Sequence, residues 1–237
     1  ASTYLQAHWT ASNQNKPLPL YVPEDCRTLK EAVNKVKHDE RITTIVLGKG
    51  EHLVEKSFGF GYRSLFITSA LNIVGRPDVP KEKILVLGGV SIMKRIQENC
   101  HLQHMTIRQS KMHGVHGLSP FTMEDVIVEQ CGYSGVVVDG TGIVATCTNV
   151  EVRECRGNGV NAYNGGAMRL IGAKTTVHHN CTNGDSDSYG LTVCGSRSST
   201  IELDSSLTKE QVSTHNGGGG NWGAETGGDI SQIKTIA

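Results

Sequence analysis

Short stretches in which apolar and polar residues alternate recur along most of the chain, and this period-two pattern is typical of half-buried β-strands. Copies of one such pattern begin at Met105, Val126, Val150 and Thr175, and a shorter copy begins at Glu210. The central apolar residues of the five copies are Ile107, Val128, Val152, Val177 and Val212. A glycine follows seven residues later in each copy: Gly114, Gly135, Gly159, Gly184 and Gly219. The fixed offset predicts a repeating unit with one coil of chain per copy.

Three short strands are expected in each coil. After the copy that begins at Val126, apolar residues alternate again at Val136 and Val138, and a third time at Ile143 and Ala145. One coil cannot bury its inner face alone, so consecutive coils must stack and share a continuous core. We therefore predict an all-β fold, a single right-handed parallel β-helix with three short strands per coil.

Stacking would place like positions of successive coils in columns. The central residues form the inward column, and the residues that follow them form an outward column: Arg108, Glu129, Arg153 and His178. Opposite charges that face each other across strands stabilise a sheet, so a charge ladder is expected there, with a binding surface as the alternative. A third column is expected to form a hydrogen-bonded stack inside the turns: Ser110, Cys131, Cys155, Asn180 and His215.

An amphipathic helix is expected before the first coil. Between residues 26 and 38, apolar residues recur on one helical face: Leu29, Ala32, Val33 and Val36. Asp25 is the expected N-cap. Such a helix would cover the open strand edges of the first coil, which is expected to begin near Ile42.

These elements divide the chain into three parts. We expect an N-terminal arm over 1–24, a capping helix over 25–40, and a β-helix over 41–237 that ends in a strand over 230–236. The arm carries aromatic residues in a polar setting without periodicity. It is either packed along the helix or a segment through which copies of the chain form a homo-oligomer.

The composition limits the classes of partner. Lysine and arginine total 23, as do aspartate and glutamate, so no basic excess indicates nucleic acid. No run of about eighteen apolar residues is present, so no membrane partner is expected. The odd number of cysteines, seven without a Cys-x-x-Cys pair, predicts buried, reduced thiols. Together with the lack of a visible signal peptide, this favours an intracellular location.

Two local motifs are weak indications. Asn180-Cys181-Thr182 matches the N-glycosylation sequon. The glycine-rich segment 216–223 is similar to a phosphate-binding loop, but no Lys-Ser/Thr follows it, and a loop that leads to the last strand is expected instead. No cofactor is expected.

Three segments carry a family resemblance: Val22-Pro-Glu-Asp-Cys-Arg-Thr-Leu-Lys-Glu-Ala-Val, Ile45-Val-Leu-Gly-Lys-Gly-Glu-His and Leu71-Asn-Ile-Val-Gly75. This opening resembles that of the pectin-lyase-like superfamily, and the later copies look like NosD-type or CASH parallel β-helix repeats. The resemblance covers roughly residues 22–236 and implies the β-helix with its capping helix. It implies no activity, because the catalytic signatures of pectin methylesterases, alginate epimerases and polygalacturonases are missing from the sequence.

The best cluster of candidate site residues is expected where one coil stacks on the next. It comprises His178, His179, Asp185 and Asp187, beside Tyr189, with Arg153 and Glu154 one coil away. Carboxylates and basic groups on one face are what acid-base chemistry on a polysaccharide needs. Solvated turns or members of the ladder are the alternative roles of these residues.

A second group of polar residues is histidine-rich: His101, His104, His113 and His116. Neutral imidazoles bind metals, but cysteine or carboxylate partners at a defined spacing are missing, so surface histidines are expected and no metal site is predicted.

Two classes of function remain open. The first is a non-enzymatic β-helix scaffold, a structural or interaction protein that docks a protein partner. The alternative is a polysaccharide-binding or polysaccharide-modifying protein with lyase-, epimerase- or hydrolase-like activity. The sequence favours the first, because no known catalytic signature of the superfamily is found, and it leaves open whether the chain is an enzyme.

Overall fold

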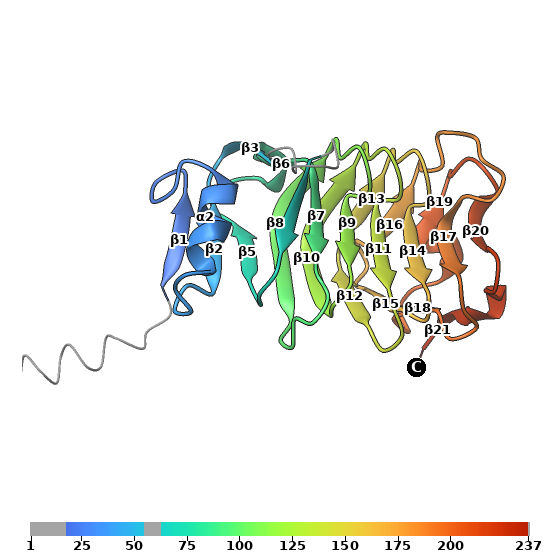
Figure 1. Ribbon diagram of the computed structural model, residues 1–237. Coiled ribbons are helices and arrows are strands. Elements are labelled where there is room, and N and C mark those ends of the chain that lie inside the picture. The colour runs from blue at the N-terminus through green and yellow to red at the C-terminus, as the bar shows by residue number, and fades with distance from the viewer. Residues whose placement is uncertain (1–17, 55–62, 237) are drawn as a thin grey trace, which may run out of the picture.

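The computed structural model describes residues 18–54 and 63–236. Within these residues the chain winds into a right-handed parallel β-helix whose coils stack along one axis (Figure 1). The predicted fold class, an all-β solenoid with three short strands per coil and an N-terminal helix, is confirmed.

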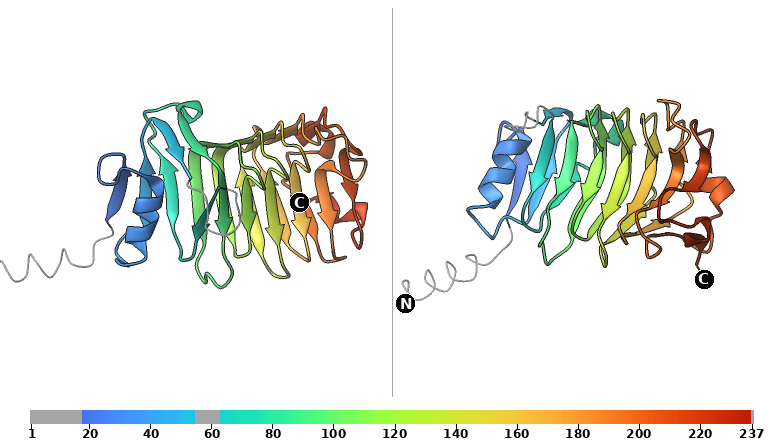
Figure 2. Two further views of the ribbon diagram at one scale, coloured as in Figure 1. Left: turned by 45° about the horizontal axis from the view of Figure 1, so that its top comes forward. Right: turned by 45° about the vertical axis from the view of Figure 1, so that its right-hand side comes forward.

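Three strand faces run along the solenoid (Figure 2). The first face contains β1 (Pro19–Val22), β2 (Thr44–Leu47), β5 (Asn72–Gly75), the first halves of β8 (Cys100–Arg108) and β10 (Phe121–Glu129), β12 (Val144–Thr148), β15 (Ala167–Ile171), β18 (Thr200–Leu203) and β21 (Ile233–Thr235). The second face contains β3 (Gly50–Leu53), β6 (Ile84–Leu87), the second halves of β8 and β10, β13 (Glu151–Arg153), β16 (Thr176–His178) and β19 (Ser213–Thr214). The third face contains β4 (Ser64–Ile67), β7 (Gly89–Ile92), β9 (Val115–Gly117), β11 (Val136–Asp139), β14 (Val160–Tyr163), β17 (Tyr189–Cys194) and β20 (Gly220–Ala224).

The first and second faces meet at a bend in the backbone. β8 bends at His104 and β10 at Asp125, with φ of 55° and 52°, and Asn149 adopts φ of 52° between β12 and β13. Few non-glycine residues enter this left-handed region, and Asn, Asp and His are enriched among those that do. The residue types at this corner therefore match the backbone conformation that the corner requires.

The inward column follows the prediction over four coils. Parallel register joins Ile107, Val128, Val152 and Val177, and each is fully buried. In the next coil the prediction is wrong by one residue, because Ser213 rather than Val212 pairs with Val177. Val212 is instead the last residue of a one-turn helix, α3 (Lys209–Val212), whose capping box is made by Thr208 and Gln211.

The repeating glycine is required by the packing of this column. A Cβ on Gly135 would lie 2.3 Å from Val152 Cγ1, and one on Gly159 would lie 2.4 Å from Val177 Cγ1. Real Cβ atoms do not approach other carbons so closely, so the turn before the third face accepts only glycine where the next coil presents a valine.

The predicted glycine column is wrong beyond Gly159. Val160 pairs with Leu191, so Gly190 rather than Gly184 stands next to Gly159, and a Cβ on Gly159 would lie 2.6 Å from Gly190 O. In the following coil Leu191 pairs with Trp222, which excludes Gly219 from the column. An inserted loop over residues 184–188 causes the first shift.

Helix α2 (Leu29–Val36) closes the N-terminal end. It buries the predicted apolar residues: Leu29, Ala32, Val33 and Val36. Its N-cap is Thr28, whose hydroxyl accepts a hydrogen bond from the Glu31 N–H (3.1 Å). The expected N-cap, Asp25, instead accepts a hydrogen bond from the Tyr21 N–H (2.8 Å).

The two ends differ in detail from the predicted boundaries. Part of the expected arm belongs to the solenoid, because β1 pairs with β2, whereas residues 1–17 lie outside the described residues. At the other end, the expected strand over 230–236 is a 3₁₀ turn, η2 (Ile230–Gln232), followed by β21. Between residues 81 and 83 a second 3₁₀ turn, η1 (Lys81–Lys83), precedes β6.

All seven cysteines are buried and unpaired, as predicted. Burial raises the pKa of Cys147 to about 12. The sequon residue Asn180 is 1% exposed, and its side chain is hydrogen-bonded inside the turn, so the folded chain does not present it for glycosylation. In the described ranges, no helix is long and apolar enough to cross a membrane.

Candidate functional site

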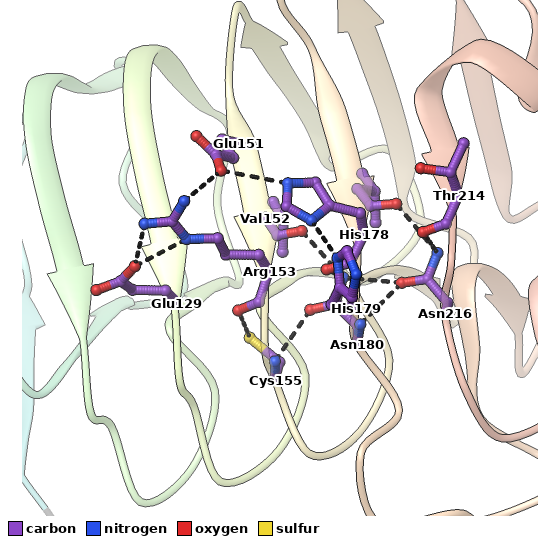
Figure 3. A network of polar contacts seen from close by, with 11 residues as sticks. Glu129, Glu151, Val152, Arg153, Cys155, His178, His179, Asn180, Thr214 and Asn216 are labelled. Atoms are coloured by element: carbon purple, nitrogen blue, oxygen red, sulfur yellow. Dashed lines mark hydrogen bonds and ion pairs between the residues drawn. The ribbon is translucent and has the colours of Figure 1, made fainter.

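Four of the predicted site residues lie on the second face or in the turn that follows it: Arg153, Glu154, His178 and His179. Figure 3 shows three of them, Arg153, His178 and His179. Arg153 donates to Glu129 from Nη2 (2.7 Å) and to Glu151 from Nη1 (2.6 Å). Glu151 also lies 3.2 Å from His178 Nε2. The predicted charge ladder is confirmed from Arg108 through Glu129 to Arg153, whereas His178 joins it through Glu151 rather than through Arg153.

The ladder holds its charges in fixed pairs. The side chain of Glu129 is only 8% exposed and lies between Arg108 (3.4 Å) and Arg153 (2.7 Å). Burial lowers the pKa of Arg153, but the hydrogen bonds and charges of Glu129 and Glu151 outweigh burial, so the net pKa is raised. Arg153 therefore stays charged and committed to its two carboxylates.

Glu154 and His179 stand in the next column, where the turn leaves the second face. Both have left-handed backbones, with φ of 56° and 55°. Glu154 Oε2 accepts a hydrogen bond from Gln130 Nε2 (2.9 Å). His179 Nδ1 lies 2.8 Å from His178 Nδ1, and its ring is stacked on that of His215 at a centroid distance of 5.5 Å.

His215 was expected one column further on, and Asn216 takes that place. Asn216 Oδ1 accepts from the Asn180 N–H (3.0 Å), and Asn180 Oδ1 accepts from the Cys155 N–H (3.1 Å). Asn180 Nδ2 donates to Val152 O (2.9 Å). The expected hydrogen-bonded stack is present from Cys155 through Asn180, and its last member is shifted by one residue to Asn216 because the register of that coil is shifted.

The other two predicted site residues, Asp185 and Asp187, lie elsewhere. Both belong to the inserted loop, and they line a cleft of about 440 Å³ at the turns between the second and third faces. We call it the Tyr133 cleft, and its lining comprises Gly132, Tyr133, Ser134, Arg156, Gly157, Asn158, Asn183, Asp185, Asp187, Ser188 and Glu225. The other four predicted site residues do not line this cleft, so the structure divides the predicted cluster into two parts.

Apart from Asp185 and Asp187, the residues of the Tyr133 cleft escaped sequence reasoning, and Asn158 and Glu225 are the most firmly held of them. Asn158 is 7% exposed, donates to Glu225 Oε1 (3.0 Å) and accepts from the Tyr189 N–H (2.7 Å). The other carboxylate oxygen of Glu225 lies 3.5 Å from Cys194 Sγ. Burial, and then the charge of Glu225, raise the pKa of Cys194 to about 11. Glu225 is thus fixed from two sides although it lies 67 residues from Asn158.

Tyr133 is the exposed aromatic residue of the cleft. It is 57% exposed, and its ring meets that of His113 edge-on at a centroid distance of 5.6 Å. Burial, and then the charge of His116, lower the pKa of His113 to about 4, so this ring is neutral near pH 7. A neutral, half-buried ring supports Tyr133 without adding charge to the cleft.

The predicted histidine group is divided in the structure, because His101 and His104 lie apart from the neighbouring rings of His113 and His116. His101 Nδ1 lies 2.7 Å from Thr122 Oγ1 on the first face. At the corner, Asp125 binds both His104 Nδ1 and Lys81 Nζ, each at 2.6 Å. Within the described part of the chain, no three His, Cys, Asp or Glu residues are grouped so that they could hold a metal ion.

No family model, no curated protein and no solved structure matches this chain. The chemistry of the site therefore comes from its geometry alone. The second face has charges that are satisfied within the molecule, whereas the Tyr133 cleft combines an exposed aromatic ring with amide, hydroxyl, carboxylate and guanidinium groups that face solvent. Of the two, the cleft offers hydrogen-bonding capacity to a ligand.

Proposed function

We propose that this protein is a non-enzymatic β-helix scaffold that binds a polysaccharide segment in the Tyr133 cleft. The observation that carries the proposal is the lining of the cleft, where an exposed tyrosine adjoins Arg156, Asn183 and Asp185. A sugar ring presents an apolar face that packs on an aromatic ring, and hydroxyls that planar polar side chains bind in pairs.

The charges of the cleft favour a neutral glycan. Asp185, Asp187 and Glu225 supply three carboxylates, and Arg156 supplies one cation. A polyuronide carries a carboxylate on every sugar, which this excess of negative charge would repel. The resemblance of the opening motif to pectin-lyase-like proteins supports a glycan ligand in general, and the cleft supports an uncharged one.

Titration calorimetry with soluble neutral glycans and polyuronides tests the proposal. We expect binding of at least one neutral glycan, and about fivefold weaker binding by Tyr133→Ala, because stacking on an aromatic ring contributes on the order of 1 kcal/mol. Tyr163→Ala is the matched control, since Tyr163 is an exposed tyrosine (37%) at the end of β14 and outside the cleft lining. Equal losses in both variants, or no binding across the panel, would contradict the proposal.

A polysaccharide-modifying activity is the second candidate, favoured by the carboxylates of the same cleft. General acid-base catalysis needs two such groups on one ligand. Measuring new reducing ends and new unsaturated products over the same panel separates the two candidates. Turnover that Asp185→Asn or Glu225→Gln abolishes would show an enzyme and would refute the non-enzymatic scaffold.

A further inference from the structure

Four asparagines of the sequence are followed by glycine: Asn158, Asn164, Asn183 and Asn216. An asparagine in this context can lose its amide without an enzyme, because a glycine lacks the side chain that would block attack by its own backbone nitrogen on the asparagine Cγ. The reaction needs a free side-chain amide and a peptide unit that can rotate. Folded structure decides which of the four pairs meets both conditions.

Asn158 and Asn216 are held by the solenoid. Both polar atoms of the Asn158 side chain are hydrogen-bonded: Nδ2 donates to Glu225, and Oδ1 accepts from the Tyr189 N–H. Asn216 accepts from the Asn180 N–H and donates to Val177 O (3.0 Å). The N–H groups of the following glycines bind across coils, Gly159 to Tyr189 O (3.1 Å) and Gly217 to Asn180 O (2.9 Å). Rotation of either peptide would break contacts between coils.

Asn164 is held in a similar way, although its side chain is exposed. Its amide donates to Asp139 Oδ1 (3.1 Å), and the Gly165 N–H binds Ser199 Oγ (2.9 Å) across coils. Gly165 is also crowded, because a Cβ there would lie 2.7 Å from Thr141 Oγ1 and 2.8 Å from Ser198 Oγ.

Asn183 and Gly184 differ from these three pairs. Both are exposed, and no atom lies within 4 Å of a Cβ placed on Gly184. The Gly184 N–H binds Cys181 O (3.1 Å), a contact within the same loop rather than between coils. The Asn183 side chain makes one long contact, from the Asp185 N–H to Oδ1 (3.3 Å). The Asn183 N–H binds Arg156 O of the neighbouring coil (3.1 Å), but this nitrogen precedes the peptide unit that must rotate, so the bond can stay in place and no strand pairing is disturbed.

We propose that Asn183 is a site of spontaneous deamidation in the folded protein. The Gly184 nitrogen loses its proton to solvent and bonds to Asn183 Cγ, the Cγ–Nδ2 bond breaks, and the amide nitrogen leaves as ammonia. Water then opens the resulting succinimide at either carbonyl, which leaves aspartate or isoaspartate at this position. The overall change consumes one water and releases one ammonia, without an oxidant or a reductant.

The modification changes the Tyr133 cleft, because Asn183 is part of its lining. A fourth carboxylate joins those of Asp185, Asp187 and Glu225 on the same cleft. The product therefore carries more negative charge at the candidate ligand site, and the isoaspartate form also lengthens the backbone of the loop by one atom. The site itself follows from the loop and does not depend on the proposed function.

Incubation of the full chain in warm, mildly alkaline buffer tests the proposal, with peptide mapping by mass spectrometry. We expect the peptide that contains Asn183 to yield aspartate and isoaspartate products at least about tenfold faster than the other three Asn-Gly peptides, since their opening costs contacts between coils. In denaturant, all four peptides should react at comparable rates. Asn183→Gln should remove the main acidic species seen by isoelectric focusing, and Asn164→Gln should leave it unchanged.

Two results would overturn the proposal. The first is an intact Asn183 in the folded chain under conditions where the denatured chain reacts. The second is reaction of Asn158, Asn164 or Asn216 in the folded chain as fast as that of Asn183.

Discussion

His113 illustrates, at the scale of one residue, how burial determines charge. Atom Nδ1 of this ring is buried, and it has no hydrogen-bond partner among the described residues. Burial is the main cause that lowers the pKa of His113 to about 4, and the neighbouring His116 adds to it. Folding therefore favours the neutral ring, whereas the unfolded chain takes up a proton near pH 6.5.

The free energy of unfolding should consequently decrease in acid, because protonation of His113 favours the unfolded chain. The folded-state pKa lies below the unfolded value, so the stabilisation is present above about pH 6.5 and is lost as the pH falls towards 4. The loss amounts to about 3 kcal/mol of unfolding free energy. Urea unfolding at several pH values should show this decrease in the free energy of unfolding between pH 6.5 and 4 in the wild type. The slope of the unfolding free energy against pH should be smaller in His113→Phe. The control His38→Gln changes an exposed histidine and should keep the wild-type slope. A His113→Phe slope equal to that of the wild type would contradict the assignment.

At the scale of the element, the sequence predicts the regular coils well and the irregular ones poorly. The alternation from Ile107 to Val177 is local in the sequence, and the register follows it without exception. The next coil fails because α3 and the inserted loop change the number of residues between strands, and a shift of one residue reverses the face of each side chain. For this reason Asn216 takes the position predicted for His215, and His215 stands one position earlier, beside His179.

The same limit applies to the candidate site. The positions of Arg153 and His178 in the repeat are enough to predict that they lie close together. In the structure both side chains contact Glu151. Asp185 lies in the inserted loop, where the repeat gives no position. The contact between Asn158 and Glu225 joins residues from non-adjacent coils, and neither residue has a partner at a recognisable spacing in the sequence.

The glycine column yields a prediction at the scale of the coil. Gly159→Ala should destabilise the protein by on the order of 1–3 kcal/mol, because the new Cβ would lie 2.4 Å from Val177 Cγ1 and 2.6 Å from Gly190 O. Gly157→Ala is the matched control in the same turn, where the nearest atom would be 3.3 Å away. Denaturant midpoints of the two variants check the prediction. A Gly157→Ala loss as large as that of Gly159→Ala would show that backbone freedom, not packing, explains the glycine.

At the scale of the whole molecule, each strand pairs only with strands of the adjacent coils, so most of the stability comes from local terms along the axis. The two ends therefore matter more than the interior, because an uncovered coil exposes strand edges and part of the core. α2 covers the first coil with four buried apolar residues, and Leu29 is 1% exposed. At the other end Trp222 continues the inward column of the third face, and Lys209 of α3 lies over its ring at 5.6 Å.

Weakening of the N-terminal cap should destabilise only the coils near it. Leu29→Ala should lower the local unfolding free energy by on the order of 2–5 kcal/mol, because truncation of a buried leucine leaves a cavity. Hydrogen exchange should then show lost protection in β1, β2 and β5, while β15 and β17 keep theirs, since disturbance spreads only from coil to coil. Asn34→Ala changes an exposed residue of the same helix and should leave all five strands protected. Uniform loss of protection along the solenoid in Leu29→Ala would mean that the coils unfold as one unit, and the additive description of this β-helix would then be wrong.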